Sequence, residues 1–156
     1  MNYRKLTKQD DQALAELIRD NLRKHHLDIP GTVYFDEGLD HLSVYYDDPL
    51  RAYYVLIYGD AVIGGVGFAE FGGFDDCCEL QKLYLCDEHK GKGLGYDMMR
   101  FLEEKAWEYG YRRIYLETHT NLMAAIHLYE KCGYREIERP ETVVHSTMNR
   151  FYLKEI

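Results

Sequence analysis

The sequence predicts a single α/β domain in which a mixed β-sheet carries helices on both faces. Three observations support this fold class. The chain of 156 residues is an ordinary length for one domain and is long enough to bury a hydrophobic core. Three strand-like segments follow one another near the middle of the chain, whereas strands and helices alternate in its second half. Because internal repeats and low-complexity tracts are absent from the sequence, we expect one domain over residues 1–156.

The first third of the chain predicts a short strand and two helices. Residues 2–6 alternate in polarity as a strand does, and Thr7-Lys8-Gln9-Asp10 has the form of a capping box at the start of a helix. A second, weaker helix is predicted over residues 36–46. The apolar residues of the first helix recur at helical spacing and end before Pro30-Gly31; they are Ala13, Leu14, Leu17, Ile18 and Leu22.

The middle of the chain predicts three strands and a long helix. Residues 51–58 and 61–71 are rich in strand-forming residues and flank a Gly59-Asp60 turn, so they predict a hairpin. A third strand is predicted over residues 79–85. A glycine-rich segment follows, and the helix that begins there keeps its apolar period as far as Tyr109.

The last part of the chain predicts a strand over residues 113–118, a helix, and two final strands. The helix has one apolar face, formed by Leu122, Ala125, Ile126 and Tyr129, and stops at Gly133. The final strands are predicted over residues 134–138 and 146–153, with a loop at Pro140 between them. The complete predicted order is β-α-α-β-β-β-α-β-α-β-β.

Composition and charge exclude several classes of protein. The mean hydropathy of −0.47 is too polar for a membrane span, and 46% hydrophobic residues are too many for a disordered chain. A net charge of −8 argues against nucleic acid or an anionic membrane as a partner. The four cysteines have no metal-ligand spacing, and no signal-like apolar run follows Met1, so we expect a reduced, metal-free protein in the cytoplasm.

The strongest candidate for a functional site is the glycine-rich segment over residues 90–95. Glycines at 91, 93 and 95 can turn successive amide groups toward one point, where a helix begins with the positive end of its dipole. The alternative is a glycine turn with solvated lysines. The residues that follow the glycines fit neither a Walker loop nor a dinucleotide fingerprint. We therefore expect a pyrophosphate cradle, with cations clustered around it: Lys82, His89, Lys90 and Lys92.

Two segments resemble motifs of the GNAT superfamily of acyl-CoA N-acyltransferases. Lys90-Gly91-Lys92-Gly93-Leu94-Gly95 is similar to its Q/R-x-x-G-x-G/A signature, with lysine at the first position. Residues 125–134 are similar to its A-x-x-L-Y-E-K-x-G-F segment, with tyrosine at the last position. The resemblance implies a GNAT fold with a mostly antiparallel, twisted sheet. It also implies acetyl-CoA as co-substrate and direct transfer of the acetyl group to a primary amine.

The resemblance also implies roles for individual residues. Glu79 matches the carboxylate that removes a proton from the amine, with Glu70 and Glu117 as substitutes; the alternative is a solvated acidic rim. Tyr129 matches the acid that protonates the departing thiolate of CoA; the alternative is a core tyrosine. Cofactor contacts are implied for the main chain of Leu83, Tyr84 and Leu85 and for Lys90, Gly91, Lys92, Gly93, Leu94, Gly95, Tyr96 and Asn121.

The acceptor is predicted only by class. Acidic residues fill the segments that shape the acceptor site in the family, which favours a cationic amine of a small molecule or peptide; the alternative is that they serve solubility alone. Two further alternatives stay open: a CoA-binding sensor or scaffold without catalysis, and a homodimer formed through residues 146–153. The acidic residues are Asp36, Glu37, Asp40, Asp47, Asp48, Glu70, Asp75 and Asp76.

Overall fold

The computed structural model describes residues 1–143 and 147–156, and within them seven strands form one sheet in the order β1-β2-β3-β4-β5-β7-β6. Only the β4–β5 pair is parallel among the pairs described, so the predicted mostly antiparallel α/β fold is confirmed. The strands are β1 (Asn2–Lys5), β2 (Ala52–Tyr58), β3 (Ala61–Glu70), β4 (Cys77–Leu85), β5 (Arg113–Thr118), β6 (Arg135–Ile137) and β7 (Arg150–Glu155).

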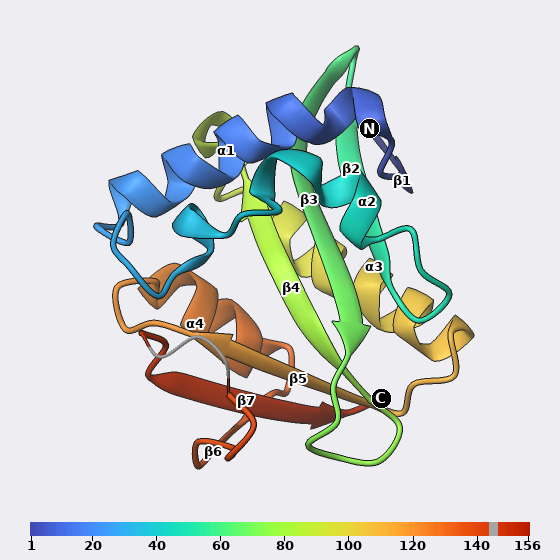
Figure 1. Ribbon diagram of the computed structural model, residues 1–156, viewed down its shortest axis with the longest axis vertical. Helices are drawn as coiled ribbons and strands as arrows, with labels where there is room; N and C mark the ends of the chain where they lie inside the picture. Colours follow the sequence, from blue (N-terminus) through green and yellow to red (C-terminus); the bar gives the residue numbers. More distant parts are fainter. Residues whose placement is uncertain (144–146) are drawn as a thin grey trace.

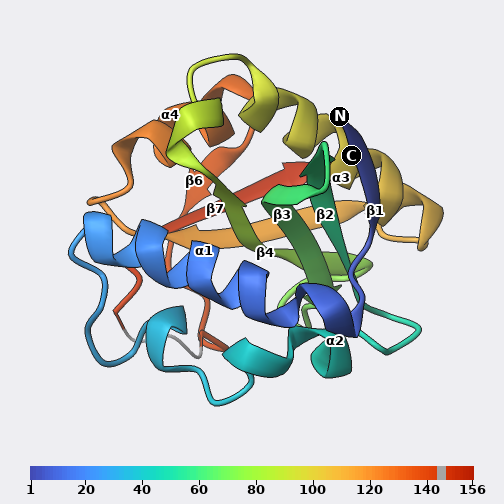
Figure 2. The same ribbon diagram turned by 90° about the horizontal axis from the view of Figure 1, so that it is seen from above.

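Helices cover both faces of the sheet, as the sequence predicts (Figure 1). Figure 2 shows α1 (Asp11–Lys24) and α2 (Leu42–Tyr45) on one face, and α3 (Leu94–Glu108) and α4 (Met123–Lys131) on the other. One hydrophobic cluster packs the sheet against α3 and α4, and a second packs it against α1. The order of strands and α-helices along the chain is the predicted one. None of the helices in the described residues is long and apolar enough to cross a membrane.

The start of α1 follows from its capping box. The backbone N–H of Thr7 donates to the Asp10 carboxylate at 2.8 Å, and the short 3-10 turn Lys8–Asp10 leads directly into the helix. Asp10 also accepts two hydrogen bonds from Arg4, at 2.7 and 2.8 Å, which join β1 to the first turn. Charge and capping therefore fix the same end of α1.

The helix predicted over residues 36–46 is much shorter in the structure, where only Leu42–Tyr45 is α-helical. The segment contains a 3-10 turn, Leu39–His41, and the four-residue α2. His41, with φ −139° and ψ 41°, interrupts the helical backbone between them. Asp11 of α1 accepts hydrogen bonds from the backbone N–H and the hydroxyl of Ser43, at 2.8 and 2.6 Å. A side chain from a different helix therefore fixes the first turn of α2.

The last predicted strand is displaced along the chain. Its first residue, Ser146, lies outside the described residues, and the observed β7 begins at Arg150 and runs to Glu155. The register with β5, from Thr118 opposite Arg150 to Arg113 opposite Glu155, sets these limits. β7 pairs with β5 along its whole length and with β6 only at Phe151, Tyr152 and Leu153. The homodimer stays a prediction.

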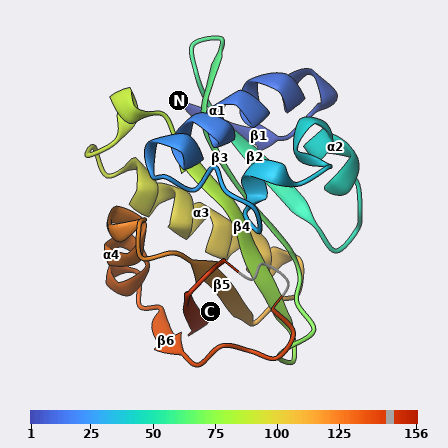
Figure 3. The ribbon, with the colours of Figure 1, turned by 60° about the vertical axis from the view of Figure 1, so that its left-hand side comes forward.

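The separation of β4 from β5 creates the space for a site. The two parallel strands pair only from Cys77 opposite Arg113 to Glu79 opposite Tyr115. β4 then continues to Leu85 and β5 to Thr118 without further pairing between them. Figure 3 shows β4 running through the middle of the molecule, with α3 and α4 to one side of it. The backbone groups of β4 beyond Glu79 therefore face a gap on the β5 side.

Candidate active site

A cavity of about 410 Å³ occupies the region where β4 and β5 diverge. It is lined by α1, the second half of β4, the glycine loop, the end of β5 and α4. The predicted site residues that line it are Glu79, Leu83, Tyr84, Leu85, Lys90, Gly91, Gly95 and Tyr129. Residues from both predicted motifs and from the predicted fourth strand thus meet around one space.

The glycine loop has the backbone that a phosphate cradle requires. Gly91 and Gly93 have φ of 72° and 81°, in the left-handed region that L side chains rarely adopt, and Gly93 is the N-cap of α3. A Cβ at either position would meet no atom within 4 Å, so open space lies beside the loop. The loop and the start of α3 therefore fit the pyrophosphate of CoA.

A buried hydroxyl at the end of β5 also fits this co-substrate. Thr118 is 2% exposed and lines the cavity, and its hydroxyl has no hydrogen-bond partner in the described residues. A buried polar group without a partner costs free energy, which an amide group of the pantetheine arm would relieve. No group of three or more His, Cys, Asp or Glu in the described residues could hold a metal ion.

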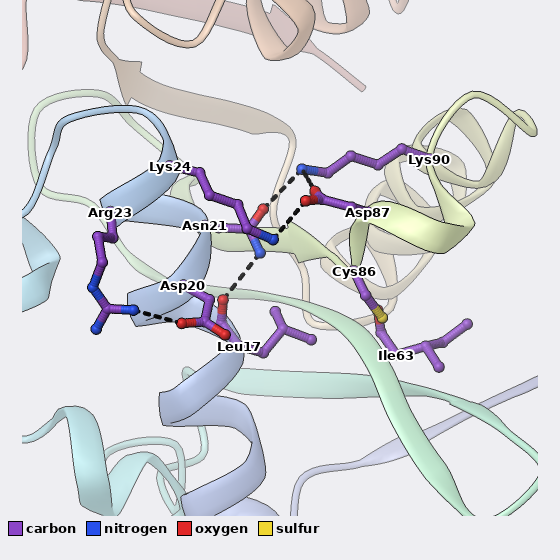
Figure 4. A network of polar contacts seen from close by, with 9 residues as sticks. All are labelled: Leu17, Asp20, Asn21, Arg23, Lys24, Ile63, Cys86, Asp87 and Lys90. Carbon is purple, nitrogen blue, oxygen red and sulfur yellow. Dashed lines mark hydrogen bonds and ion pairs between the residues drawn. The ribbon is translucent and has the colours of Figure 1, made fainter.

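Lys90 joins the glycine loop to α1 (Figure 4). Its ammonium donates to Asn21 Oδ1 at 3.0 Å and to Asp87 Oδ1 at 2.6 Å, while Lys24 of α1 donates to Asp87 Oδ2 at 2.5 Å. The hydrogen bonds from the two lysines lower the pKa of Asp87 to about 2. The first residue of the signature therefore connects two elements around the cavity, and the loop amides are left for the phosphates.

Other predicted cofactor residues lie around the cavity without lining it. These are Lys92, Gly93, Leu94, Tyr96 and Asn121. Lys92 is exposed, and Tyr96 is 40% exposed on the first turn of α3. Asn121 donates to the backbone oxygen of His25 at 3.0 Å and so ties the β5–α4 loop to the end of α1. Their contacts with CoA stay predictions.

Lys82, predicted among the cations around the glycine loop, lines the same cavity as Lys90 and Gly91, but its ammonium has a different charged neighbour. Lys82 and Leu83 together lie opposite Val66 of β3, where the register shifts, and Lys82 has φ 53°. This bulge turns the Lys82 side chain toward the segment between α1 and β2, where its Nζ lies 4.0 Å from Asp36 Oδ2 and 5.9 Å from the centre of the Tyr45 ring.

Tyr129 is a buried residue of the cavity wall. It lies on α4, is 6% exposed, and its hydroxyl makes no hydrogen bond within the described residues. Burial, and to a smaller extent Cys132, raises the pKa of the Tyr129 phenol above its usual value. The phenol therefore stays protonated at neutral pH and can donate a proton.

Glu79 is oriented by two successive hydrogen bonds. Gln81 donates to Glu79 Oε2 at 3.1 Å, and the hydroxyl of Tyr46 donates to Gln81 Oε1 at 2.9 Å. Glu117 of β5, which accepts from Tyr115 at 3.1 Å, lines the same cavity. Two carboxylates therefore lie at the point where the strands separate.

A second cavity, of about 300 Å³, adjoins the first, since Glu79, Gln81 and Glu117 line both. Its wall also contains the rings of Tyr45 and Phe71 and the carboxylate of Glu70. Glu70 is paired with Arg51, and this hydrogen bond lowers the pKa of the carboxyl. The second cavity lies at the opposite end of β4 from the glycine loop.

The two adjacent thiols do not have the properties of a nucleophile. Cys77 and Cys78 are 4% and 0% exposed, on alternate faces of β4. Burial is the main cause that raises the pKa of Cys77 to about 11, and it raises the pKa of Cys78 further. Both cysteines therefore stay protonated thiols, and the geometry favours direct transfer over a covalent acyl-enzyme.

Comparison with known proteins decides the family. The model of the acetyltransferase (GNAT) family matches residues 12–134. The chain belongs to the acetyltransferase (GNAT) family. It is 40% identical over 137 residues to the uncharacterized N-acetyltransferase YjgM of Escherichia coli K12, covering 86% of this chain and 82% of that protein. It is 32% identical over 105 residues to the spermine/spermidine N(1)-acetyltransferase of Bacillus subtilis 168, covering 62% and 64%.

Solved structures of this GNAT fold agree along the whole chain. An acetyltransferase of the GNAT family from Staphylococcus aureus superposes with a TM-score of 0.85 at 18% identity, covering 99% of this chain and 98% of the other. A PaiA N-acetyltransferase from Thermoplasma acidophilum, solved with coenzyme A, has a TM-score of 0.76 at 17% identity and covers 99% and 98%. The predicted family and enzyme class, an acetyl-CoA-dependent N-acetyltransferase, are confirmed.

Several residues of this GNAT site carry no motif that sequence reasoning could detect. Asn21, Gln81 and Thr118 line the cavity, but each is an isolated polar residue within a helix or strand pattern. One available signal was the glycine content of β3, because glycines inside a strand mark a bulge or a close approach of another group. That signal points to the irregular part of β4 at Lys82.

Proposed function

We propose that this chain acts in the cytoplasm and passes the acetyl group of acetyl-CoA directly to a primary amine of a small molecule or a peptide. The observation that supports this most is the meeting of Glu79, Tyr129 and the unpaired part of β4 around one cavity, with the glycine loop at its end. These are the groups that binding, deprotonation of the amine and protonation of the thiolate require.

Glu79 is the proposed base. An amine with a pKa near that of lysine, about 10.4, arrives as an ammonium ion at neutral pH and cannot attack until it loses a proton. Glu79 accepts this proton, directly or through water, while Gln81 and Tyr46 hold the carboxylate in place through their hydrogen bonds. The acidic residues around the second cavity favour an acceptor that arrives with a positive charge, and a relative named for spermine and spermidine supports an amine acceptor.

Tyr129 is the proposed acid. As the new nitrogen–carbon bond forms, the carbon–sulfur bond breaks, and Tyr129 gives its proton to the sulfur while Glu79 holds the first proton taken from the ammonium. The nitrogen then loses a second proton, which restores the Tyr129 phenol through water, and Glu79 releases its proton to solvent. The buried phenol keeps its proton until that step because burial raises its pKa. The backbone of Leu83, Tyr84 and Leu85 borders the same cavity, where it can bind the pantetheine amides.

A thiol-release assay with acetyl-CoA and a panel of primary amines tests this function. We expect turnover with at least one amine, and a loss of about 100-fold in kcat for Glu79→Gln. Glu117→Gln is the matched control, since Glu117 lines the same cavities; a larger loss in that variant would make Glu117 the base. Absence of turnover with every amine, while CoA still binds, would instead identify a CoA-binding scaffold.

A further inference from the structure

Lys82 is a buried ammonium without a hydrogen-bond acceptor. Its side chain is 10% exposed, and its Nζ makes no hydrogen bond within residues 1–143 and 147–156. The nearest carboxylate, Asp36, lies at 4.0 Å, whereas the Arg4–Asp10 and Arg19–Asp40 pairs of the same protein are in contact at 2.7 Å. A buried charge normally has its hydrogen bonds satisfied, and within the described residues the ion pair with Asp36 leaves the donors of this ammonium unused, so it can bind a further acceptor.

The backbone around Lys82 is built to hold this side chain in place. The hydroxyl of Tyr53 donates to the Lys82 carbonyl at 2.7 Å, across β3. The Tyr53 ring fits there because β3 has glycines beneath it: a Cβ at Gly65 would lie 2.5 Å from the ring, and one at Gly67 closer still. The Tyr53 hydroxyl and the glycines that make room for its ring therefore support the non-glycine residue at φ 53°.

The position of Lys82 separates it from the phosphates of CoA. β4 ends at Leu85, three residues after Lys82, which corresponds to about 10 Å of strand. The glycine loop begins beyond that end. Glu79 and Gln81 lie on the same side of β4 as Lys82, and all three line the cavity. The ammonium therefore faces the place where the amine is deprotonated.

From this geometry we propose that Lys82 binds a carboxylate on the acceptor, so that the preferred acceptor is an amine that also carries a carboxylate group. This inference rests on the proposed function and names its substrate class. The acceptor's ammonium would meet Glu79, and its carboxylate would meet the Lys82 ammonium, which completes the missing hydrogen bonds of a buried charge. A simple polyamine would leave Lys82 without an acceptor and place like charges together.

Matched pairs of acceptors test the proposal. Each pair consists of an amino acid and the amine that its decarboxylation yields, for both α-amino and ω-amino acids, assayed with acetyl-CoA and the full chain. For the wild type we expect kcat/KM to favour the carboxylate-bearing member by about tenfold or more. Lys82→Met should raise KM for that member by about 10- to 100-fold and change the kinetics of the decarboxylated member less than about threefold. Lys82→Arg should recover part of the preference.

The same pairs of acceptors serve for a control variant and for the results that would contradict the proposal. Lys8→Met, which removes an exposed lysine from the turn before α1, should change neither member. Equal losses for both members in Lys82→Met would make Lys82 a structural residue, and a wild-type preference for the decarboxylated members would overturn the proposal.

Calorimetric titration of the amino acids into the CoA-bound protein gives a readout without turnover. Weaker binding in Lys82→Met would support the carboxylate site even if catalysis fails, whereas equal or undetectable binding in both proteins would refute it.

Discussion

At the residue scale, the hydroxyl of Tyr129 is the group whose removal tests catalysis most directly. Tyr129→Phe keeps the ring and its packing on α4 but removes the proton donor. We expect kcat to fall about 100-fold, because protonation of the departing thiolate is lost, while the dissociation constant for CoA stays nearly the same. The thiol-release assay and calorimetric titration with CoA measure the two quantities.

Tyr134→Phe is the matched control for Tyr129→Phe. Tyr134 is 3% exposed, its ring centre lies 6.2 Å from that of Tyr129, and it does not line the cavity. We expect unchanged turnover in this control. Unchanged turnover in Tyr129→Phe as well would make Tyr129 a packing residue only.

Single residues also show where sequence reasoning stops. Glu79 and Tyr129 were identified because they occupy positions in strand and motif patterns that a single sequence displays. The contact of Lys82 with Asp36 could not be predicted, because a strand pattern implies alternating faces and the extra residue of a bulge shifts this alternation. The bulge depends on a tyrosine from β2 and glycines of β3, so it arises from tertiary packing that local sequence does not encode.

At the scale of elements, the glycine loop can be tested with a matched pair of glycines. Gly93→Val should weaken CoA binding strongly, because a β-branched residue disfavours φ 81° and its side chain would occupy the space beside the loop amides. Gly110→Val is the control: Gly110 has φ 95° and lies beyond the C-terminal end of α3, and a Cβ there would meet no atom within 4 Å.

Both glycine variants should lose stability by about 1–2 kcal/mol from backbone strain. Only Gly93→Val should alter the dissociation constant for CoA, measured by calorimetry. Equal CoA affinity in the two variants would contradict the cradle.

The contact between β1 and the start of α1 predicts a pH dependence of stability. The hydrogen bond from Arg4 is the main cause that lowers the pKa of Asp10 to about 2, against about 3.9 in the unfolded chain. Because the folded pKa is the lower one, the ionised carboxylate stabilises the fold above about pH 4, and this contribution is lost as the pH falls toward 2.

Urea denaturation of Asp10→Asn measures this contribution. We expect a loss of about 1–2 kcal/mol at neutral pH, since Arg4 is 43% exposed and its charge is partly screened, and a smaller further loss between pH 4 and 2 than in the wild type. Asp20→Asn, which breaks an exposed ion pair with Arg23 on α1, should change stability little. An unaltered acid-unfolding profile in Asp10→Asn would show that the ion pair does not stabilise the fold.

Elements were predictable where their signals are local. The capping box, the helical stripes and the hairpin turn each lie within one short segment, and these elements formed as predicted. The helix predicted over residues 36–46 is shorter in the structure, where Asp11, from another helix, fixes the start of α2. The predicted limits of β7 differ from the observed ones for a related reason, since pairing with β5 determines where the strand begins and ends.

At the scale of the whole molecule, binding of acetyl-CoA should stabilise the fold. At about a hundredfold above its dissociation constant, a ligand that binds only the folded state adds about 2.7 kcal/mol, or several degrees in Tm for a domain of this size. We expect this shift with acetyl-CoA and CoA but not with NAD or ATP, measured by thermal unfolding. No shift with any CoA ester would contradict the assignment of the cavity.

The packing of Tyr53 against β3 has a consequence for how this sequence can vary. The ring at position 53, the missing side chains at positions 65 and 67, and the bulged carbonyl at position 82 form one arrangement drawn from three strands. A homologue that keeps the ring must keep glycine at both positions, and one that loses the ring is free to replace Gly65. Gly67 is still required, because a Cβ there would lie 2.7 Å from the Ala52 backbone oxygen. Positions 53 and 65 are therefore expected to change together during evolution, although they lie on different strands.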